Sequence, residues 1–341
     1  MNKLRTVLVT GGAGYVGAVL VPKLLNQGCH VRVLDLYTFG EDVFDDFKDK
    51  SNLQEIKGDI CDQELLKANL KDCDAVIHLA CIANDPTFEL NPELSRRVNF
   101  DAFEPLVRIS KESGVQRFIY ASTCSVYGIS DAENVTEDHP LVPITDYNKY
   151  KGLCEPVLLK YQSADFTTVT IRPATVCGYS PRQRFDLTVN ILTNHAYNKN
   201  HITVFGGKQE RPNIHIEDIT DLYVLLLDLP KEKIAGKIYN AGYQNRSIED
   251  IARIVQNVFT QEFPDRAKPT IATTPSDDIR SYRISSEKIK RELGFVPTHT
   301  LEDAVRDLIR AFEAGKFNAP MDNIRYYNIK MLKAVNSQCN V

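Results

Sequence analysis

The stretch Thr6–Gly17, which reads Thr-Val-Leu-Val-Thr-Gly-Gly-Ala-Gly-Tyr-Val-Gly, constrains the fold more than any other part of the chain. Its apolar run ends in a cluster of glycines, and an apolar helical pattern follows to about Gln27. A strand that turns sharply into a helix presents backbone N–H groups and the positive end of the helix dipole to a bound pyrophosphate. Glycines let the backbone approach the phosphates closely. The residues that we expect to form this dinucleotide site are Gly11, Gly14, Tyr15, Val16 and Gly17.

The acid at the end of the next apolar run indicates which dinucleotide binds. The run 30–34 ends in Asp35, at the distance expected for the carboxylate that binds an adenosine ribose. Leu36 and Tyr37 follow, so no arginine stands directly after the acid to receive a 2′-phosphate. We therefore predict NAD as the cofactor, rather than NADP.

Apolar runs that mostly do not alternate recur through the first half of the chain, with helical patterns between them. This pattern is typical of strands buried on both faces of a parallel sheet. We predict an α/β protein, with a Rossmann-type doubly wound parallel sheet and a smaller C-terminal α/β substrate lobe. The runs lie at 5–9, 30–34, 54–57, 75–80, 117–121 and 167–172.

The predicted domains follow from where this regular alternation stops. Residues 1–176 form the NAD-binding Rossmann domain, and 214–240 return to it. Residues 177–213 and 241–330 form the substrate lobe. The remainder, 331–341, has a weak pattern, and we expect a tail that frays.

Two further strand ends fall on the expected cofactor edge. In an open parallel sheet, ligands bind beyond the carboxyl ends of the strands. Asp59 and Ile60 follow the third strand, and we place them near the adenine. Leu79 and Ala80 end the fourth strand, and we place them near the ribose and diphosphate.

Composition excludes several other classes of protein. The chain has 341 residues and a mild net charge of −4, which points neither to nucleic acid nor to a membrane surface. No apolar stretch approaches the length of a bilayer span, and the N-terminus runs quickly into a strand. The eight cysteines are scattered without metal-ligand spacing. We expect reduced thiols in a cytoplasmic protein, and no metal.

Tyr147 and Lys151 stand four residues apart, so on a helix both side chains share one face. A nearby ammonium favours the phenolate, and we expect Lys151 to lower the pKa of Tyr147. A tyrosine tuned in this way can act as general acid and base on a hydroxyl group. Thr123, at the end of the fifth strand, could hydrogen-bond the same hydroxyl group. The nicotinamide would take the hydride itself.

These motifs together resemble those of the extended short-chain dehydrogenases/reductases, in the nucleotide-sugar epimerase/dehydratase family. The resemblance covers nearly the whole chain. The segments that carry it are 10–17, Asp35, 59–60, 78–80, 98–99, 122–123, Tyr147 with Lys151 and Glu155, 172–173, and Arg211 with 215–218.

The resemblance implies an NAD-dependent enzyme that acts on a nucleotide-diphosphate sugar, in surface polysaccharide biosynthesis. It implies that Thr123, Tyr147 and Lys151 are catalytic and that Lys151 also holds the nicotinamide ribose. Asn99 and Pro173 would lie on the cofactor side, and Arg211 would pair with the substrate diphosphate, a task that suits arginine. It also implies a homodimer through the helices near 92–113 and 147–162.

The chain departs from the family pattern mainly on the substrate side. Family dehydratases carry acids directly after the catalytic threonine, whereas Cys124 and Ser125 follow Thr123 here. An arginine expected near Pro275 is missing, and Arg280 or Arg283 could replace it. The residues that we assign to the substrate are Ser125, Arg182, Arg184, Asn190, Arg211 and Arg280.

Several activities remain open at this point. We favour a 4-epimerase that oxidises C4 of the sugar reversibly through a 4-keto intermediate. A nucleotide-sugar 4-dehydrogenase and a 4-keto reductase would use the same acid–base group. A 4,6-dehydratase and a nonenzymatic NAD-binding regulator are the weaker alternatives, because the first lacks its acids here and the second typically loses Tyr147 or Lys151.

Overall fold

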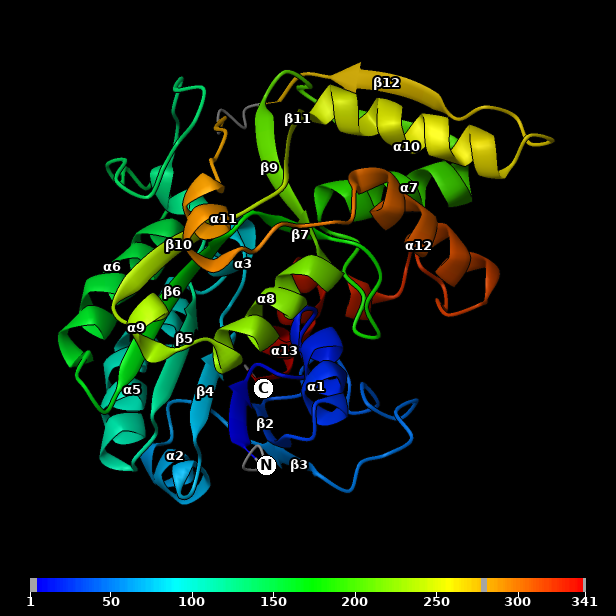
Figure 1. Cartoon of the computed structure of the whole chain (residues 1–341). Coiled ribbons are helices and arrows are strands. Elements are labelled where there is room, and N and C mark those ends of the chain that lie inside the picture. Colours follow the sequence, from blue (N-terminus) through cyan, green and yellow to red (C-terminus); the bar gives the residue numbers. More distant parts are fainter. Residues whose placement is uncertain (1–4, 277–280, 340–341) are drawn as a thin grey trace.

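The centre of the protein is a parallel sheet, as predicted. The computed structural model describes residues 5–276 and 281–339. Within them the main sheet has seven strands in the order β10-β6-β5-β4-β1-β2-β3 (Figure 1). Every neighbouring pair in this sheet is parallel. The strands are β1 (Thr6–Thr10), β2 (His30–Asp35), β3 (Leu53–Lys57), β4 (Ala75–His78), β5 (Arg117–Ala121), β6 (Thr167–Pro173) and β10 (Lys237–Ala241).

Helices bury both faces of this sheet. Val7 and Val9 of β1 enter one apolar core, whereas Leu8 enters another, because successive side chains of a strand point to opposite faces. The first core includes α1 (Gly17–Asn26) and α8 (Ile216–Asp228), and the second includes α2 (Gln63–Leu70), α5 (Phe103–Glu112) and α6 (Asp146–Tyr161). The doubly wound sheet is therefore confirmed.

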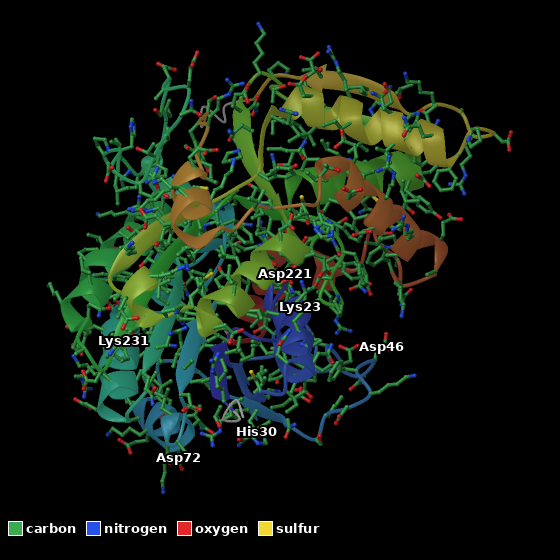
Figure 2. All side chains as sticks on the ribbon, in the orientation of Figure 1. Lys23, His30, Asp46, Asp72, Asp221 and Lys231 are labelled. Atoms are coloured by element: carbon green, nitrogen blue, oxygen red, sulfur yellow. The ribbon has the colours of Figure 1, made fainter. Side chains whose placement is uncertain are left out.

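An ion pair joins α1 to α8 although the two helices are far apart in the sequence. Lys23 Nζ of α1 lies 2.5 Å from Asp221 Oδ1 of α8 (Figure 2). Residues after 214 thus return to the sheet that the first half of the chain builds. β10 then pairs with β6 at the edge of the main sheet.

A second group of elements packs beside the carboxyl ends of the main strands (Figure 1). Three of its helices share an apolar core of their own. Its strands form one three-stranded and one two-stranded sheet among the described residues. The elements are β7 (Thr175–Cys177), α7 (Thr188–Lys199), β8 (His201–Phe205), β9 (Glu210–His215), β11 (Gln244–Ser247), α10 (Ile248–Glu262), β12 (Thr270–Thr274) and α12 (Leu301–Glu313).

Shorter helices connect these units. The short helices and turns are α3 (Asp85–Phe88), α4 (Pro92–Arg96), η1 (Arg97–Asp101), η2 (Cys124–Tyr127), α9 (Lys231–Ile234), α11 (Glu287–Leu293) and η3 (Ile324–Tyr326).

The C-terminal segment differs from the prediction. We expected residues 331–341 to form a fraying tail, but α13 (Asn328–Cys339) is a helix. It contacts α3, and in Figure 1 it lies behind α8, near the centre of the molecule. Leu332 and Val335 line the main cavity. A helix with a weak sequence pattern gains its stability from tertiary packing, so no local pattern predicted it.

Candidate active site

A cavity of about 710 Å³ lies beyond the carboxyl ends of the main strands, between the sheet and the second group of elements. It brings together most of the residues that we predicted from the sequence. The predicted residues that line it are Gly11, Gly14, Tyr15, Val16, Gly17, Asp35, Asp59, Ile60, Leu79, Ala80, Thr123, Ser125, Tyr147, Lys151, Pro173, Arg182, Arg184 and Arg211.

The glycine turn is shaped by the close approach of two strand ends. Gly11 follows β1 with φ +72°, and a Cβ atom there would lie 2.5 Å from the backbone nitrogen of Ala80. A side chain at this position would therefore push β4 away. Gly14 faces the cavity, and α1 begins at Gly17. The first turn of a helix has N–H groups without intrahelical partners, which suits an anion.

Asp35 is held at the far end of the same cavity. Its Oδ2 accepts a hydrogen bond from Ala13 N at 3.0 Å, and its Oδ1 accepts one from Tyr37 N at 2.9 Å. Burial raises the pKa of Asp35 above its ordinary value, while the two backbone donors oppose that shift. The carboxylate is thus held in place by backbone groups at the position where a ribose would be bound. The glycine turn and Asp35 together fit NAD.

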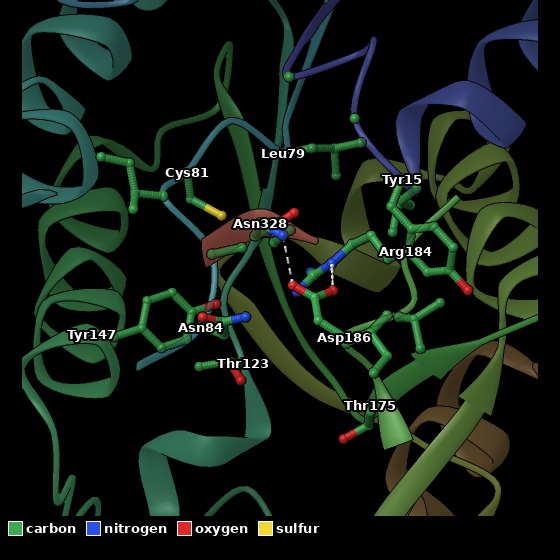
Figure 3. Close-up of a pocket in the computed structure, with 18 of the residues that line it drawn as sticks. Tyr15, Leu79, Cys81, Asn84, Thr123, Tyr147, Thr175, Arg184, Asp186 and Asn328 are labelled. Carbon is green, nitrogen blue, oxygen red and sulfur yellow. Dashed lines mark hydrogen bonds and ion pairs between the residues drawn. The ribbon is translucent and has the colours of Figure 1, made fainter. Parts of the chain in front are cut away.

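Tyr147 and Lys151 enter the cavity from one face of α6, and Thr123 enters it from the end of β5. Figure 3 shows Tyr147 and Thr123 on one side of the pocket, with Arg184 and Asp186 facing them. Lys151 Nζ donates to Ala121 O at 2.7 Å, which leaves further N–H groups for a ligand. Thr123 Oγ1 accepts from Ser125 N at 3.2 Å, so its own hydroxyl group is available to donate.

The structure corrects the expected pKa of Tyr147. Burial raises the pKa of this phenol well above its ordinary value, and the nearby Cys81 and Asp85 raise it further. Arg184 is the nearby charge that lowers it most, whereas we had predicted that Lys151 would. The ammonium of Lys151 is directed to Ala121 O instead. In the chain alone Tyr147 is therefore a neutral proton donor, and it needs further positive charge to act as a base.

A buried ion pair fixes α6 against the ends of β5 and β6. Arg172 Nη2 lies 2.6 Å from Glu155 Oε2, and Arg172 Nε donates to Glu155 Oε1 at 3.0 Å. Ser122 Oγ also donates to Glu155 Oε1, at 2.6 Å. All three residues lie next to, or one helical turn from, a residue that lines the cavity. The pair therefore sets where Tyr147 and Lys151 stand relative to Thr123.

Three predicted site residues do not line the cavity. Asn99 bonds both backbone groups of Ile82, so it supports the loop after β4. Asn190 is fully buried, and its side chain bonds Tyr15 Oη, Arg184 O and Gly178 N. The structure thus gives both asparagines a supporting position behind the cavity wall. Arg280 lies outside the described residues.

Other cavity residues escaped the sequence reasoning. Asn84 and Asp85, which we did not assign to the site from the sequence, both line the cavity near Tyr147. Asn84 has φ +72°, a strained conformation that occurs often at functional sites. Asn328 donates its backbone N–H to Asp186 Oδ2 at 2.9 Å. No local pattern marked Asn328, because its position depends on the packing of the C-terminal segment.

The described residues show no group of three or more His, Cys, Asp or Glu side chains that could hold a metal ion. In the same residues no helix is both long and apolar enough to span a bilayer. The free thiols are Cys29, Cys61, Cys73, Cys81, Cys124, Cys154 and Cys177.

Comparisons with known proteins agree with this geometry. The model of the NAD dependent epimerase/dehydratase family matches residues 7–242. A UDP-glucose 4-epimerase of Azospirillum brasilense is 26% identical over 320 residues, which cover 88% of this chain and 89% of that protein. A dTDP-glucose 4,6-dehydratase of Streptomyces niveus is 25% identical, and the match covers 91% of this chain and 93% of that protein.

The fold is shared with solved structures of the same kind. The crystal structure of a UDP-glucuronic acid 4-epimerase from Bacillus cereus, in complex with UDP-glucuronic acid and NAD, superposes with a TM-score of 0.80. The two chains are 26% identical, and the match covers 91% of this chain and 99% of that one.

Proposed function

Because the chain belongs to the NAD-dependent epimerase/dehydratase family, whose members are enzymes acting on nucleotide sugars, we propose that it is a nucleotide-sugar 4-epimerase. One observation carries the proposal. A single cavity holds a dinucleotide turn with its ribose acid and, further along, an acid–base tyrosine beside a threonine and a lysine. Bound NAD supplies a hydride acceptor that can also return the hydride.

The residues of the chain handle the proton. With NAD bound as the hydride acceptor, Tyr147 Oη would take the proton of the C4 hydroxyl group, so that oxidation at C4 would leave a 4-keto sugar. Thr123 would orient the hydroxyl group, and the charge of Arg184, which lowers the pKa of Tyr147, would favour the deprotonation. Lys151, on the same face of α6, would hold the nicotinamide ribose. Tyr147 would give the proton back to the C4 oxygen when the ketone is reduced from its other face, which would complete the inversion and regenerate the coenzyme.

The residues after Thr123 argue against a 4,6-dehydratase, although enzymes of that kind are among the relatives. Elimination of water needs an acid close to C5 and C6 of the sugar. Cys124 is buried, and its thiol donates to Pro173 O at 2.9 Å. Burial raises the pKa of this thiol to about 12. Ser125 Oγ is paired with Tyr282 Oη at 3.0 Å. Neither side chain is suited to that step.

The test separates the epimerase from a 4-dehydrogenase and a 4-keto reductase, which would use the same acid–base group. The purified protein is loaded with NAD and offered UDP-, GDP- and dTDP-sugars separately. NADH absorbance and the stereochemistry of the sugar are followed together. We expect inversion at C4 with no lasting rise in NADH. Stoichiometric NADH without an inverted sugar would instead establish a dehydrogenase.

We also propose that the protein is a homodimer through the helices near 92–113 and 147–162. Leu153 and Leu159 of α6 are large apolar side chains that are 42% and 50% exposed in the single chain. Light scattering after size exclusion would give twice the mass of the chain. Leu153→Glu should shift that mass to the monomer, whereas Val296→Glu, at another exposed apolar position, should not.

A further inference from the structure

Arg182 is a buried cation that forms no ion pair with the described residues, although the more distant charges of Asp186 and Asp35 partly offset its own. The residue is only 5% exposed, and it lines the cavity. Its Nε and Nη1, which carry three of the five N–H groups of the side chain, have no hydrogen-bond partner among the described residues. Burying a charge without compensation is costly, so such a group points to an anionic ligand.

Arg184, unlike Arg182, has a counterion within the described part of the chain. Arg184 Nε lies 2.9 Å from Asp186 Oδ1. Arg182 has no such ion pair in the part of the chain that the structure describes, and the charge of Arg184 repels it. Burial and this repulsion lower the pKa of Arg182 to about 9, so it stays charged at neutral pH.

Two neighbours contact the guanidinium group of Arg182, and a third residue holds one of these neighbours in place. Its carbon lies 3.6 Å from the centre of the Phe39 ring, and its Nη2 donates to Asn328 Oδ1 at 2.6 Å. Arg325 Nε, in the C-terminal segment, donates to Phe39 O at 2.7 Å. The C-terminal segment thus fixes Arg182 both directly and through Phe39.

These neighbours lie at the coenzyme end of the cavity. Phe39 follows Asp35, the ribose acid, in the loop after β2. The charge of Arg182 lowers the pKa both of Asp35 and of Tyr15, which belongs to the glycine turn. An anion that is bound by the turn and carries an adenosine toward Asp35 would therefore pass close to Arg182.

We propose that Arg182 is a ligand of the diphosphate of NAD. The sequence alone had assigned it to the substrate. The segment between β7 and α7 and the C-terminal segment would then hold the coenzyme together with the glycine turn. The inference does not depend on which sugar, or which reaction at C4, the enzyme uses.

Calorimetric titration of the coenzyme-free protein tests the assignment. The ligands are NAD, ADP, adenosine and UDP. Arg182→Met keeps an apolar side chain against Phe39 but removes the charge. We expect it to lower the affinity for NAD and for ADP by about 10- to 100-fold, which is the range expected for loss of a charged hydrogen bond. The affinities for adenosine, which lacks the phosphates, and for UDP should change by less than about threefold.

Two further variants serve as controls. Arg182→Lys keeps the charge and should recover most of the affinity for NAD. Arg246→Met removes an exposed arginine whose Nη1 bonds the neighbouring carbonyl group, and it should change nothing. Loss of UDP binding with NAD unaffected would assign Arg182 to the substrate instead. Unchanged affinity for all four ligands, or an equal loss for adenosine, would also overturn the proposal.

A stability measurement distinguishes this role from a structural one. A buried cation without full compensation costs stability, so coenzyme-free Arg182→Met should unfold at the same denaturant concentration as the wild type or higher. A lower midpoint would mean that Arg182 mainly supports the fold. If Arg182→Met does not fold, Asn328→Ala provides the same comparison of NAD with adenosine, because it removes the bond that orients Nη2.

Discussion

Glu155 and Arg172 form a buried bidentate ion pair, with contacts of 2.6 and 3.0 Å between α6 and β6. Removing one member of such a pair leaves the other charge buried and unpaired. We expect Glu155→Gln to lower the free energy of unfolding by about 3 kcal/mol. Denaturant titration would measure this loss, provided that the unfolding free energy of both proteins depends on denaturant concentration with the same slope.

The double variant Glu155→Met with Arg172→Met provides the matched comparison. It removes both charges together. We therefore expect it to lower the free energy of unfolding by less than the sum of the losses in Glu155→Met alone and Arg172→Met alone. An additive result would show that the two side chains do not interact in the manner described.

Replacing Tyr147 should remove turnover but leave the coenzyme bound. A positioned acid–base group contributes roughly 10²- to 10⁴-fold to rate, so we expect Tyr147→Phe to lower kcat by that factor on the sugar that the wild type inverts. Tyr161→Phe is the control, because this tyrosine of the same helix bonds Glu104 at the surface. Unchanged kcat in Tyr147→Phe would disprove the catalytic assignment.

The glycine turn can be tested by adding a single methyl group. Gly11→Ala places a Cβ atom 2.5 Å from Ala80 N in a residue with φ +72°. Gly28 has a similar φ of +78°, but a Cβ atom there meets nothing within 4 Å. Both variants should lose about 1–2 kcal/mol for the left-handed conformation.

The steric clash should separate the two glycine variants. We expect only Gly11→Ala to lose further stability and to weaken NAD binding, as measured by denaturant titration and calorimetry. Equal losses in both variants would show that the approach of β1 to β4 does not matter.

His78 should make the folded protein sensitive to acid. It is buried against Thr10, whose Oγ1 lies 2.7 Å from Nδ1. Burial, with the charge of Lys151, lowers the pKa of His78 to about 3. The unfolded chain binds a proton near pH 6.5, so it takes up more protons than the folded chain between these values. The stability that is linked to neutral His78 is therefore fully present above pH 6.5, and it is lost as the pH decreases toward 3.

His78→Asn removes this titration and keeps a polar partner for Thr10. Between pH 6 and pH 4 the wild type should lose roughly 2 kcal/mol more stability than the variant, at up to about 1.4 kcal/mol per pH unit. Denaturant midpoints at several pH values would measure this difference. Parallel curves for the two proteins would contradict the prediction.

Local pattern was enough for the architecture and for the coenzyme. The glycine turn, Asp35 and the buried strands are recognisable from residues close together in the sequence, because strand and helix periods are set by backbone geometry. The spacing of Tyr147 and Lys151 placed both on one helical face for the same reason. These parts of the prediction required no knowledge of how the chain packs.

Packing settled the features that the sequence reasoning missed or misjudged. The pKa of Tyr147 depends on its burial and on Asp85 and Arg184, which lie far from it in the chain. Arg182 meets Phe39 and Asn328 only because three distant segments converge at one end of the cavity. Burial and through-space charge belong to the folded molecule, so no local period in the sequence encodes them.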